Sequence, residues 1–251
     1  MRLAGQRRHI QKSNGDEKMK TLIVLLLLLI PWIANADTSL TALAIGQSNP
    51  AGRGEIYPED LHRIHGAFLL NGNRFVAART PLNQYSLIKK DVVQKYSFVN
   101  ELFALLAEDY TVYGIVQARG GSDIACWSRG GFCYDTTVEL VNRNSIKIDI
   151  IFIHQGESNR RDEGYPVMLA RTITNLREDL GVNCPVIVGE IAPCDYDAVL
   201  HNRRLQKIYD LVENVRVVDS KGLTTLGPYH FDNASSKELG RRYYDAFLEL
   251  Y

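Results

Sequence analysis

A serine follows the first strand-like segment of the chain, at a point where the backbone must turn. Residues 39–46 (SLTALAIG) are apolar and typical of a β-strand, and they end at Gly46, directly before Gln47, Ser48 and Asn49. A serine hydroxyl is a weak nucleophile until a neighbouring base accepts its proton. Ser48 is therefore a candidate nucleophile, provided that the fold brings a base to it.

His230 is the candidate base, by elimination among six histidines. His9 lies in the N-terminal leader, and His201 lies in a helical segment whose face we expect to be solvated. His62 and His65 share an irregular stretch without the Asp or Glu partners at ligand spacing that a metal site needs, so we expect no metal.

His154 is the rival base, because it ends the strand-like segment 147–154. Alternation along an extended strand places its side chain on the opposite face from Gln155 and Glu157. We therefore expect His154 to be a hydrogen-bonded histidine beside the site, and His230 to be the base.

Five apolar segments alternate with segments of helical periodicity. The strand-like segments are 39–46, 111–117, 147–154, 185–191 and 215–220. The helical segments are 97–110, a stretch around 135–144, 165–180, 196–212 and 233–250. This alternation predicts a three-layer α/β/α sandwich with a five-stranded parallel sheet, in which the loops after the strands form the ligand edge. Residues 55–96 are expected to form a long, partly extended excursion over the top of the sheet.

The first 36 residues resemble an export signal. Residues 19–36 (MKTLIVLLLLLIPWIANA) combine a lysine, a short apolar run and a small-residue end, a pattern typical of a secretory signal peptide cleaved after Ala36. The apolar run is shorter than the roughly 20 residues of a membrane-spanning helix. Translation starts either at Met19, which we favour, or at Met1 with a long polar leader. We expect one domain over residues 37–251, in the periplasm or outside the cell.

The predicted mature chain is mildly acidic. Without residues 1–36 it carries 23 basic and 27 acidic residues, and the basic residues form no cluster. This balance argues against a nucleic-acid partner.

All four cysteines lie in the predicted exported part, where oxidation is permitted. Four cysteines allow three pairings. We favour Cys126–Cys133 and Cys184–Cys194, because each pair closes a short loop that contains Gly or Pro. The spacings match no tetrahedral zinc pattern, and buried free thiols are the alternative.

Four post-strand segments together resemble a known family. GQSNPAGRG (46–54), RGGSDIACW (119–127), HQGESN (154–159) and YHFD (229–232) are similar, in order, to the blocks of the SGNH hydrolase superfamily. The closest resemblance is to its carbohydrate-esterase branch, which includes acetylxylan esterases and sialate O-acetylesterases. The resemblance implies a flavodoxin-like sheet and assigns the catalytic histidine to His230.

Ester hydrolysis also needs hydrogen-bond donors at the developing oxyanion, each typically worth about 3–4 kcal/mol. Our candidates are the backbone N–H groups of Ser48 and Gly121 and the side-chain amide of Gln155. The resemblance assigns a donor to the loop with Gly120 and Gly121 but leaves open which glycine supplies it. The alternative is that the glycine pair forms only a tight turn.

The sequence departs from the family pattern at one position. Many SGNH hydrolases carry an aspartate three residues before the catalytic histidine, where this chain has Gly227. Either the site is a Ser–His dyad or another carboxylate orients the imidazole. Glu157 is our preferred substitute because it shares a loop with Gln155, whereas Asp232 is expected to cap the last helix.

Together these features predict a serine esterase that removes O-acetyl groups from acetylated xylan, an oligosaccharide or O-acetyl sialic acid, without metal or organic cofactor. Asn49 and Arg53 are expected to hold the nucleophile loop or to contact the sugar, and Trp127 to stack on a pyranose ring or to pack. An inactive sugar-binding protein on the same fold and an esterase of small non-sugar esters are the alternatives. The oligomeric state stays open.

Overall fold

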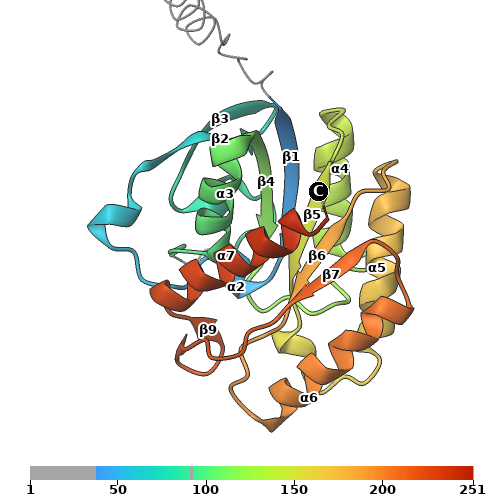
Figure 1. Ribbon diagram of the computed structural model, residues 1–251. Coiled ribbons are helices and arrows are strands. Elements are labelled where there is room, and N and C mark those ends of the chain that lie inside the picture. Colours follow the sequence, from blue (N-terminus) through green and yellow to red (C-terminus); the bar gives the residue numbers. More distant parts are fainter. Residues whose placement is uncertain (1–37, 91–92, 251) are drawn as a thin grey trace, which may run out of the picture. The chain divides into compact units, whose positions relative to one another are not determined.

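A computed structural model describes residues 38–90 and 93–250, and its centre is a mixed sheet with helices on both faces (Figure 1). In the described part the sheet has seven strands: β1 (Ser39–Gly46), β2 (Arg63–Asn71), β3 (Arg74–Arg79), β4 (Thr111–Ala118), β5 (Ile150–His154), β6 (Val186–Gly189) and β7 (Val215–Val218). Their order is β3-β2-β4-β1-β5-β6-β7. Neighbouring strands are parallel, except that β2 and β3 are antiparallel.

The five predicted strands correspond to β1, β4, β5, β6 and β7. Numbered along the chain as 1 to 5, they lie in the order 2-1-3-4-5, which is the flavodoxin-like arrangement. The predicted α/β class is therefore confirmed, whereas the predicted strand number is too small. The hairpin of β2 and β3 extends the sheet beside β4, where we expected an excursion over its top. The hairpin turns at Gly72 and Asn73, and this turn signal was present in the sequence.

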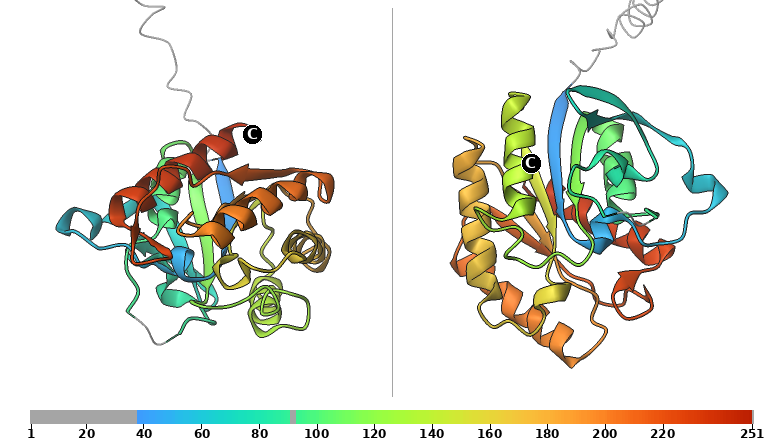
Figure 2. Two further views of the ribbon diagram at one scale, coloured as in Figure 1. Left: turned by 90° about the horizontal axis from the view of Figure 1, so that it is seen from below. Right: turned by 180° about the vertical axis from the view of Figure 1, so that it is seen from behind.

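Two helical layers cover the sheet (Figure 2). One layer has α3 (Phe98–Asp109) and α7 (Asn233–Leu248), and the other has α4 (Phe132–Arg143), α5 (Tyr165–Asp179) and α6 (Tyr196–Leu205). Alternate residues of β1 face the two layers: Leu43 and Ile45 belong to the core under α4 and α5, while Ala42 and Ala44 belong to the core under α3 and α7. Burial on both faces explains why the strands read as continuous apolar runs.

The carboxyl ends of β1, β4 and β5 lie at one edge of the sheet, beside the short helix α2 (Ser48–Ala51) (Figure 1). In the register of the strands, Gly46 is paired with both Ala118 and His154. Gly46 has φ of +140°, and a Cβ atom there would lie 1.9 Å from the carbonyl oxygen of His154. Only glycine therefore allows the chain to turn here so close to β5.

Three further elements lie at this edge. The 3₁₀ turn η3 (Glu157–Asn159) follows β5, and the short strands β8 (Thr225–Leu226) and β9 (His230–Phe231) form a hairpin before α7. The remaining 3₁₀ turns of the described residues are η1 (Pro58–Asp60), η2 (Leu82–Tyr85) and η4 (Gln206–Asp210). The segments that carry the predicted site residues therefore follow strands or precede the last helix.

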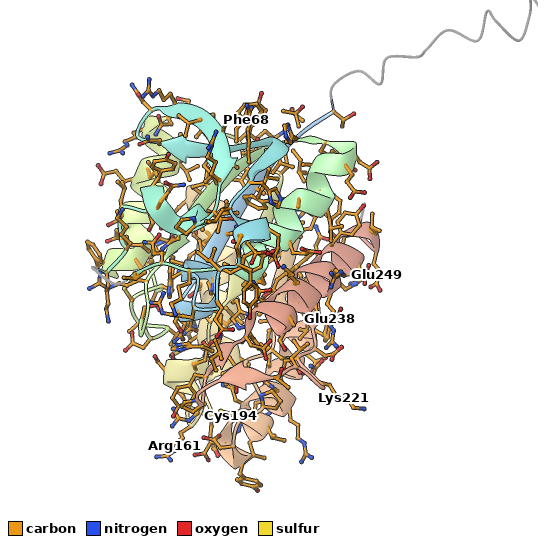
Figure 3. The ribbon with its side chains drawn as sticks, turned by 90° about the vertical axis from the view of Figure 1, so that its left-hand side faces the viewer. Phe68, Arg161, Cys194, Lys221, Glu238 and Glu249 are labelled. Atoms are coloured by element: carbon orange, nitrogen blue, oxygen red, sulfur yellow. A yellow bond between two sulfur atoms is a disulfide. The ribbon has the colours of Figure 1, made fainter. Side chains whose placement is uncertain are left out.

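One of the two predicted disulfides is present. Cys126 and Cys133 are joined, with their Cα atoms 5.0 Å apart. Cys184 and Cys194 are free, so the second predicted pair is wrong. Cys184 is buried. Cys194 is exposed (Figure 3). These two cysteines lie at opposite ends of β6, and a strand of that length spans about 13 Å. A disulfide tolerates at most about 7 Å between Cα atoms.

The predicted leader and signal peptide, residues 1–36, lie outside the described residues. Within residues 38–90 and 93–250, no helix has the length and apolar character needed to cross a membrane. The same residues contain no group of three or more His, Cys, Asp or Glu side chains placed to hold a metal ion.

Candidate active site

A cavity of about 400 Å³ opens at the carboxyl edge of the sheet. The described residues that line it come from five segments of the chain: Gln47, Ser48, Arg53, Lys90, Gly120, Gly121, Glu157, Ser158, Arg160, Tyr229 and His230. The fold therefore brings the candidate nucleophile Ser48 and the candidate base His230 into one cavity, although they are far apart in the sequence.

Gln47 ties the nucleophile segment to the loop after β5. Its Oε1 accepts hydrogen bonds from the backbone N–H groups of Gly156 (3.1 Å) and Ser158 (3.4 Å) and from Nε2 of Gln155 (3.2 Å). Its Nε2 donates to Oγ of Ser158 (3.2 Å). Sequence reasoning assigned no role to Gln47, although it directly precedes the candidate nucleophile.

Two of the three predicted oxyanion donors line the cavity, and the third does not. Ser48 is 6 % exposed and Gly121 is exposed at the cavity. Gly120 lies against Arg53 and Ser48, because a Cβ atom there would lie 2.6 Å from Nη2 of Arg53 and 3.9 Å from Cβ of Ser48.

Gln155 is wrongly predicted as an oxyanion donor. It is 1 % exposed, and its Nε2 donates to Oε1 of Gln47 (3.2 Å), Oδ1 of Asn159 (2.9 Å) and the carbonyl of Ser122 (3.4 Å). Because both of its N–H bonds are directed at internal acceptors, its amide braces the loops beneath the site.

Glu157 is buried at the cavity wall, with Asn49 and His154 as partners. Its Oε1 accepts a 2.6 Å hydrogen bond from Nδ2 of Asn49 and lies 3.6 Å from Nε2 of His154. Burial alone raises the pKa of this carboxyl, but the imidazole of His154, the backbone and Asn49 together lower the pKa below its ordinary value. Among the described residues, no hydrogen bond joins Glu157 to His230, so a direct Glu157–His230 pair is absent.

The fully buried His154 lies beside the site and on the opposite face of the sheet from Gln155, as predicted: its ring lies near those of Phe98 and Tyr243 in the core under α3 and α7, whereas Gln155 lies with Trp127 on the side of α4 and α5. Nδ1 of His154 lies 3.3 Å from the hydroxyl of Tyr243. Glu157 does not follow the expected alternation, because its Oε1 lies 3.6 Å from Nε2 of His154. The strand ends at His154 and the chain turns at Gly156 (φ +146°), so strand alternation no longer governs the direction of Glu157. The prediction of a solvated His201 is also wrong, because this residue is 1 % exposed.

His230 is half-buried at the cavity. Burial lowers the pKa of its imidazole below the ordinary value, the charge of Arg53 lowers it further, and the charge of Glu157 acts in the opposite direction. A histidine with a lowered pKa is neutral near pH 7, the form that accepts a proton from a serine.

The position of the missing aspartate lies in the turn between β8 and β9. Gly227 has φ of +65°, in the left-handed region that favours glycine. Asp232 caps α7, as predicted: its Oδ1 accepts a 2.7 Å hydrogen bond from the backbone N–H of Ser235. Neither position therefore supplies a carboxylate to His230.

The three predicted sugar-contact residues have different surroundings. Arg53 lines the cavity, and its Nη1 donates to the Gly52 carbonyl (2.6 Å). Asn49 is 5 % exposed and makes internal hydrogen bonds, so it holds loops together and does not line the cavity. Trp127 is 2 % exposed and donates from Nε1 to Oγ of Ser122 (3.0 Å), so the predicted sugar stacking is wrong. The segment closed by the disulfide turns this indole into the core under α4 and α5.

Sequence reasoning gave no role to five of the described cavity residues: Gln47, Lys90, Ser158, Arg160 and Tyr229. Lys90 lies in the segment 55–96, in which we found no pattern. Arg160 directly follows HQGESN, and Tyr229 directly precedes His230. The guanidinium of Arg160 stacks on the ring of Tyr229, 5.0 Å from its centre. Arg160 and Tyr229 could have been identified from the sequence, because each is next to a motif residue.

Comparison with known proteins identifies the family. Residues 40–249 match the family model described as "Carbohydrate esterase, sialic acid-specific acetylesterase". The chain belongs to this carbohydrate esterase family. It is accordingly a carboxylic ester hydrolase. Among curated protein sequences, none matches this carbohydrate esterase significantly.

Solved structures show the same fold. A protein from Arabidopsis thaliana is 25 % identical with a TM-score of 0.72, and the match covers 84 % of this chain and 98 % of that one. A carbohydrate acetylesterase from Xanthomonas citri is 14 % identical (TM-score 0.63), covering 84 % and 56 % of the two chains. A family 3 carbohydrate esterase from Clostridium thermocellum is 12 % identical (TM-score 0.56), covering 84 % and 96 %. The same fold is found in a lipolytic protein of the G-D-S-L family from Veillonella parvula, which is 12 % identical (TM-score 0.50), covering 84 % and 100 %.

Proposed function

We propose that this carbohydrate esterase removes O-acetyl groups from an acidic sugar through an acyl-enzyme on Ser48. The observation that carries the proposal is that Ser48 and His230 line the same cavity. His230 accepts the proton of the Ser48 hydroxyl while Oγ attacks the acetyl carbonyl. The resulting oxyanion is stabilised by the backbone N–H groups of Ser48 and of the Gly120–Gly121 loop.

The second half of the cycle reverses these roles. The tetrahedral intermediate expels the sugar oxygen, which takes the proton from His230, and leaves acetyl-Ser48. Water then attacks the acetyl carbonyl while His230 accepts its proton. Collapse returns that proton to Oγ of Ser48 and releases acetate. No step requires a metal or an organic cofactor.

The charge of the cavity favours an acidic substrate. Of the described residues that line it, Arg53, Lys90 and Arg160 carry permanent positive charge, and Glu157 is the acidic one. Glu157 is held by Asn49 and His154, so its charge has partners on the protein side. We therefore propose O-acetylated sialic acid, whose carboxylate suits this cavity, rather than neutral acetylated xylan. The family description supports the same choice.

Acetate release from O-acetylated sialic acid and from acetylated xylan tests both parts of the proposal. We expect the wild type to prefer the sialic acid and Ser48→Ala to be inactive on both. Lys90→Ala should raise KM for the acidic sugar roughly fivefold, since an exposed charge pair contributes up to about 1 kcal/mol. Its control is Lys89→Ala, because Lys89 is exposed but does not line the cavity.

Two results would contradict these expectations separately. Equal rates for the wild type and Ser48→Ala would refute the acyl-serine mechanism. Preference for xylan, with Lys90→Ala and Lys89→Ala indistinguishable, would refute the acidic sugar but leave the mechanism intact.

We also propose that the enzyme acts outside the cytoplasm, in the periplasm or beyond the cell. The disulfide between Cys126 and Cys133 supports this location, because disulfides persist in oxidising compartments. The signal-peptide pattern of residues 19–36 supports it independently.

A further inference from the structure

The carboxamide of Asn49 uses both of its polar atoms on the segments around the site. Its Nδ2 donates to Oε1 of Glu157 (2.6 Å) and to the backbone carbonyl of Tyr229 (3.1 Å). Its Oδ1 accepts from the backbone N–H of Phe231 (3.2 Å). Asn49 is 5 % exposed, so these hydrogen bonds are shielded from water and leaving a partner unsatisfied would be costly.

The two backbone hydrogen bonds hold the chain on either side of His230. Tyr229 precedes it and Phe231 follows it, so the carboxamide of Asn49 closes a clamp over this residue. The imidazole of His230 itself makes no side-chain hydrogen bond within the described residues. Because β9 comprises only His230 and Phe231, the sheet contributes little to holding this segment. The clamp therefore holds the backbone from which the imidazole projects.

The hydrogen bond from Asn49 to Glu157 brings a carboxylate into the same arrangement. Glu157 lies between Nδ2 of Asn49 and Nε2 of His154. On the far side of His154, Nδ1 lies 3.3 Å from the hydroxyl of Tyr243, which donates to the Ile153 carbonyl (2.7 Å). This chain of contacts holds a carboxylate at the cavity wall, where its charge favours the protonated form of His230.

We propose that Asn49 is the positioning residue for His230, in place of the acid that the family pattern has at position 227. It holds the backbone on both sides of His230 and holds Glu157, and it follows the nucleophile Ser48 directly in the chain. Movement of the nucleophile and the base is thereby coupled through one side chain. The inference rests on the proposed function, because it assigns the base role to His230.

Steady-state kinetics of Asn49→Ala and Asn49→Asp, as a function of pH, test this role. We expect Asn49→Ala to lower kcat about a hundredfold, the loss that a misplacement of about 1 Å brings, with KM changed less than threefold. In Asn49→Asp the new carboxylate lies beside Glu157 and near His230. We expect a low kcat and an acid limb of the kcat profile displaced to higher pH, because added negative charge favours the protonated imidazole.

Asn202→Ala is the matched control. Asn202 is also buried, at 6 % exposure, and its carboxamide also clamps backbone, donating to the Ile191 carbonyl (2.8 Å) and accepting from its N–H (3.1 Å). It lies outside the catalytic cavity. We expect this variant to lose stability in urea but to keep kcat within about threefold of the wild type. A structural effect alone would lower kcat equally in both asparagine variants.

The outcomes separate the two proposals. If Asn49→Ala keeps the wild-type kcat while Ser48→Ala is inactive, the positioning role is refuted and the proposed function stands. If Ser48→Ala is fully active, the proposed function fails whatever Asn49 does. Should Asn49→Ala not fold, a kcat and acid limb of Asn49→Asp equal to the wild type would refute the positioning role.

Discussion

Two opposite charges act on the pKa of His230. Arg53 lines the cavity beside it and lowers the pKa of the imidazole, whereas Glu157 acts in the opposite direction, and burial lowers the pKa more than either charge. The free enzyme needs a neutral His230 to accept the serine proton. The position of the acid limb in the pH profile of kcat/KM therefore reports this balance of charges.

Arg53→Gln should displace that acid limb to higher pH. Removing the positive charge makes protonation of His230 easier, so its pKa rises and the neutral base is lost at a higher pH than in the wild type. The measurement is kcat/KM for p-nitrophenyl acetate, a neutral ester, between pH 4 and 8. Arg161→Gln is the control, because Arg161 is exposed, pairs with Asp197 and does not line the cavity. Superimposable profiles for all three proteins would contradict the assigned role of Arg53.

At the scale of elements, the segment after β4 serves both the site and the core. Its first residues, Gly120 and Gly121, line the cavity, and its later part is closed by the disulfide between Cys126 and Cys133 at the start of α4. Trp127 lies inside this closed part and packs in the core. The disulfide thus stabilises the packing of α4 without contributing a cavity residue.

Replacing both bonded cysteines by alanine should lower stability and spare catalysis. For a loop with a sequence separation of 7, the chain-entropy model gives a loss of about 2–3 kcal/mol in the free energy of unfolding. Urea unfolding and kcat of Cys126→Ala/Cys133→Ala measure the two effects. Cys194→Ala, which removes an exposed free thiol, should stay within about 0.5 kcal/mol of the wild type. Unchanged stability with a large loss of kcat would contradict this division of roles.

At the scale of the whole molecule, a buried histidine links stability to pH. The ring of His201 packs 4.4 Å from the ring of Tyr165, on the side of the sheet that holds α5 and α6. Burial lowers the pKa of His201 from 6.5 to about 4. In the unfolded chain the imidazole has its ordinary pKa of 6.5. Between pH 4 and pH 6.5 the unfolded state therefore binds more protons than the folded state.

Stability should therefore fall as the pH is lowered from 6.5 towards 4. The contribution of His201 is complete above pH 6.5 and amounts to about 3 kcal/mol, since one pKa unit corresponds to about 1.36 kcal/mol. Urea unfolding at pH 7.5, 6 and 5 should give a shallower dependence for His201→Gln than for the wild type. His65→Gln is the control, because His65 is at an exposed position on strand β2. Parallel curves for His201→Gln and the wild type would refute the linkage.

Much of the architecture followed from local patterns. The segments 39–46 and 165–180 were predicted nearly to their observed ends, because burial on two faces and helical periodicity leave signals within a few consecutive residues. The hairpin of β2 and β3 was missed because its strands are only partly buried and lack the continuous apolar runs of the central strands. Ser48 and His230 were identifiable because strand ends and family motifs mark them in the chain.

Local sequence patterns did not predict the contacts within the site. The partners of Asn49 are at positions 157, 229 and 231, and the acceptors of Gln155 come from segments before and after it. The indole of Trp127 could have faced a sugar or the core with the same neighbours in sequence. Which polar groups pair, and which aromatic rings are buried, depends on how distant segments pack, because hydrogen bonds and burial depend on distances in space and not on separation along the chain.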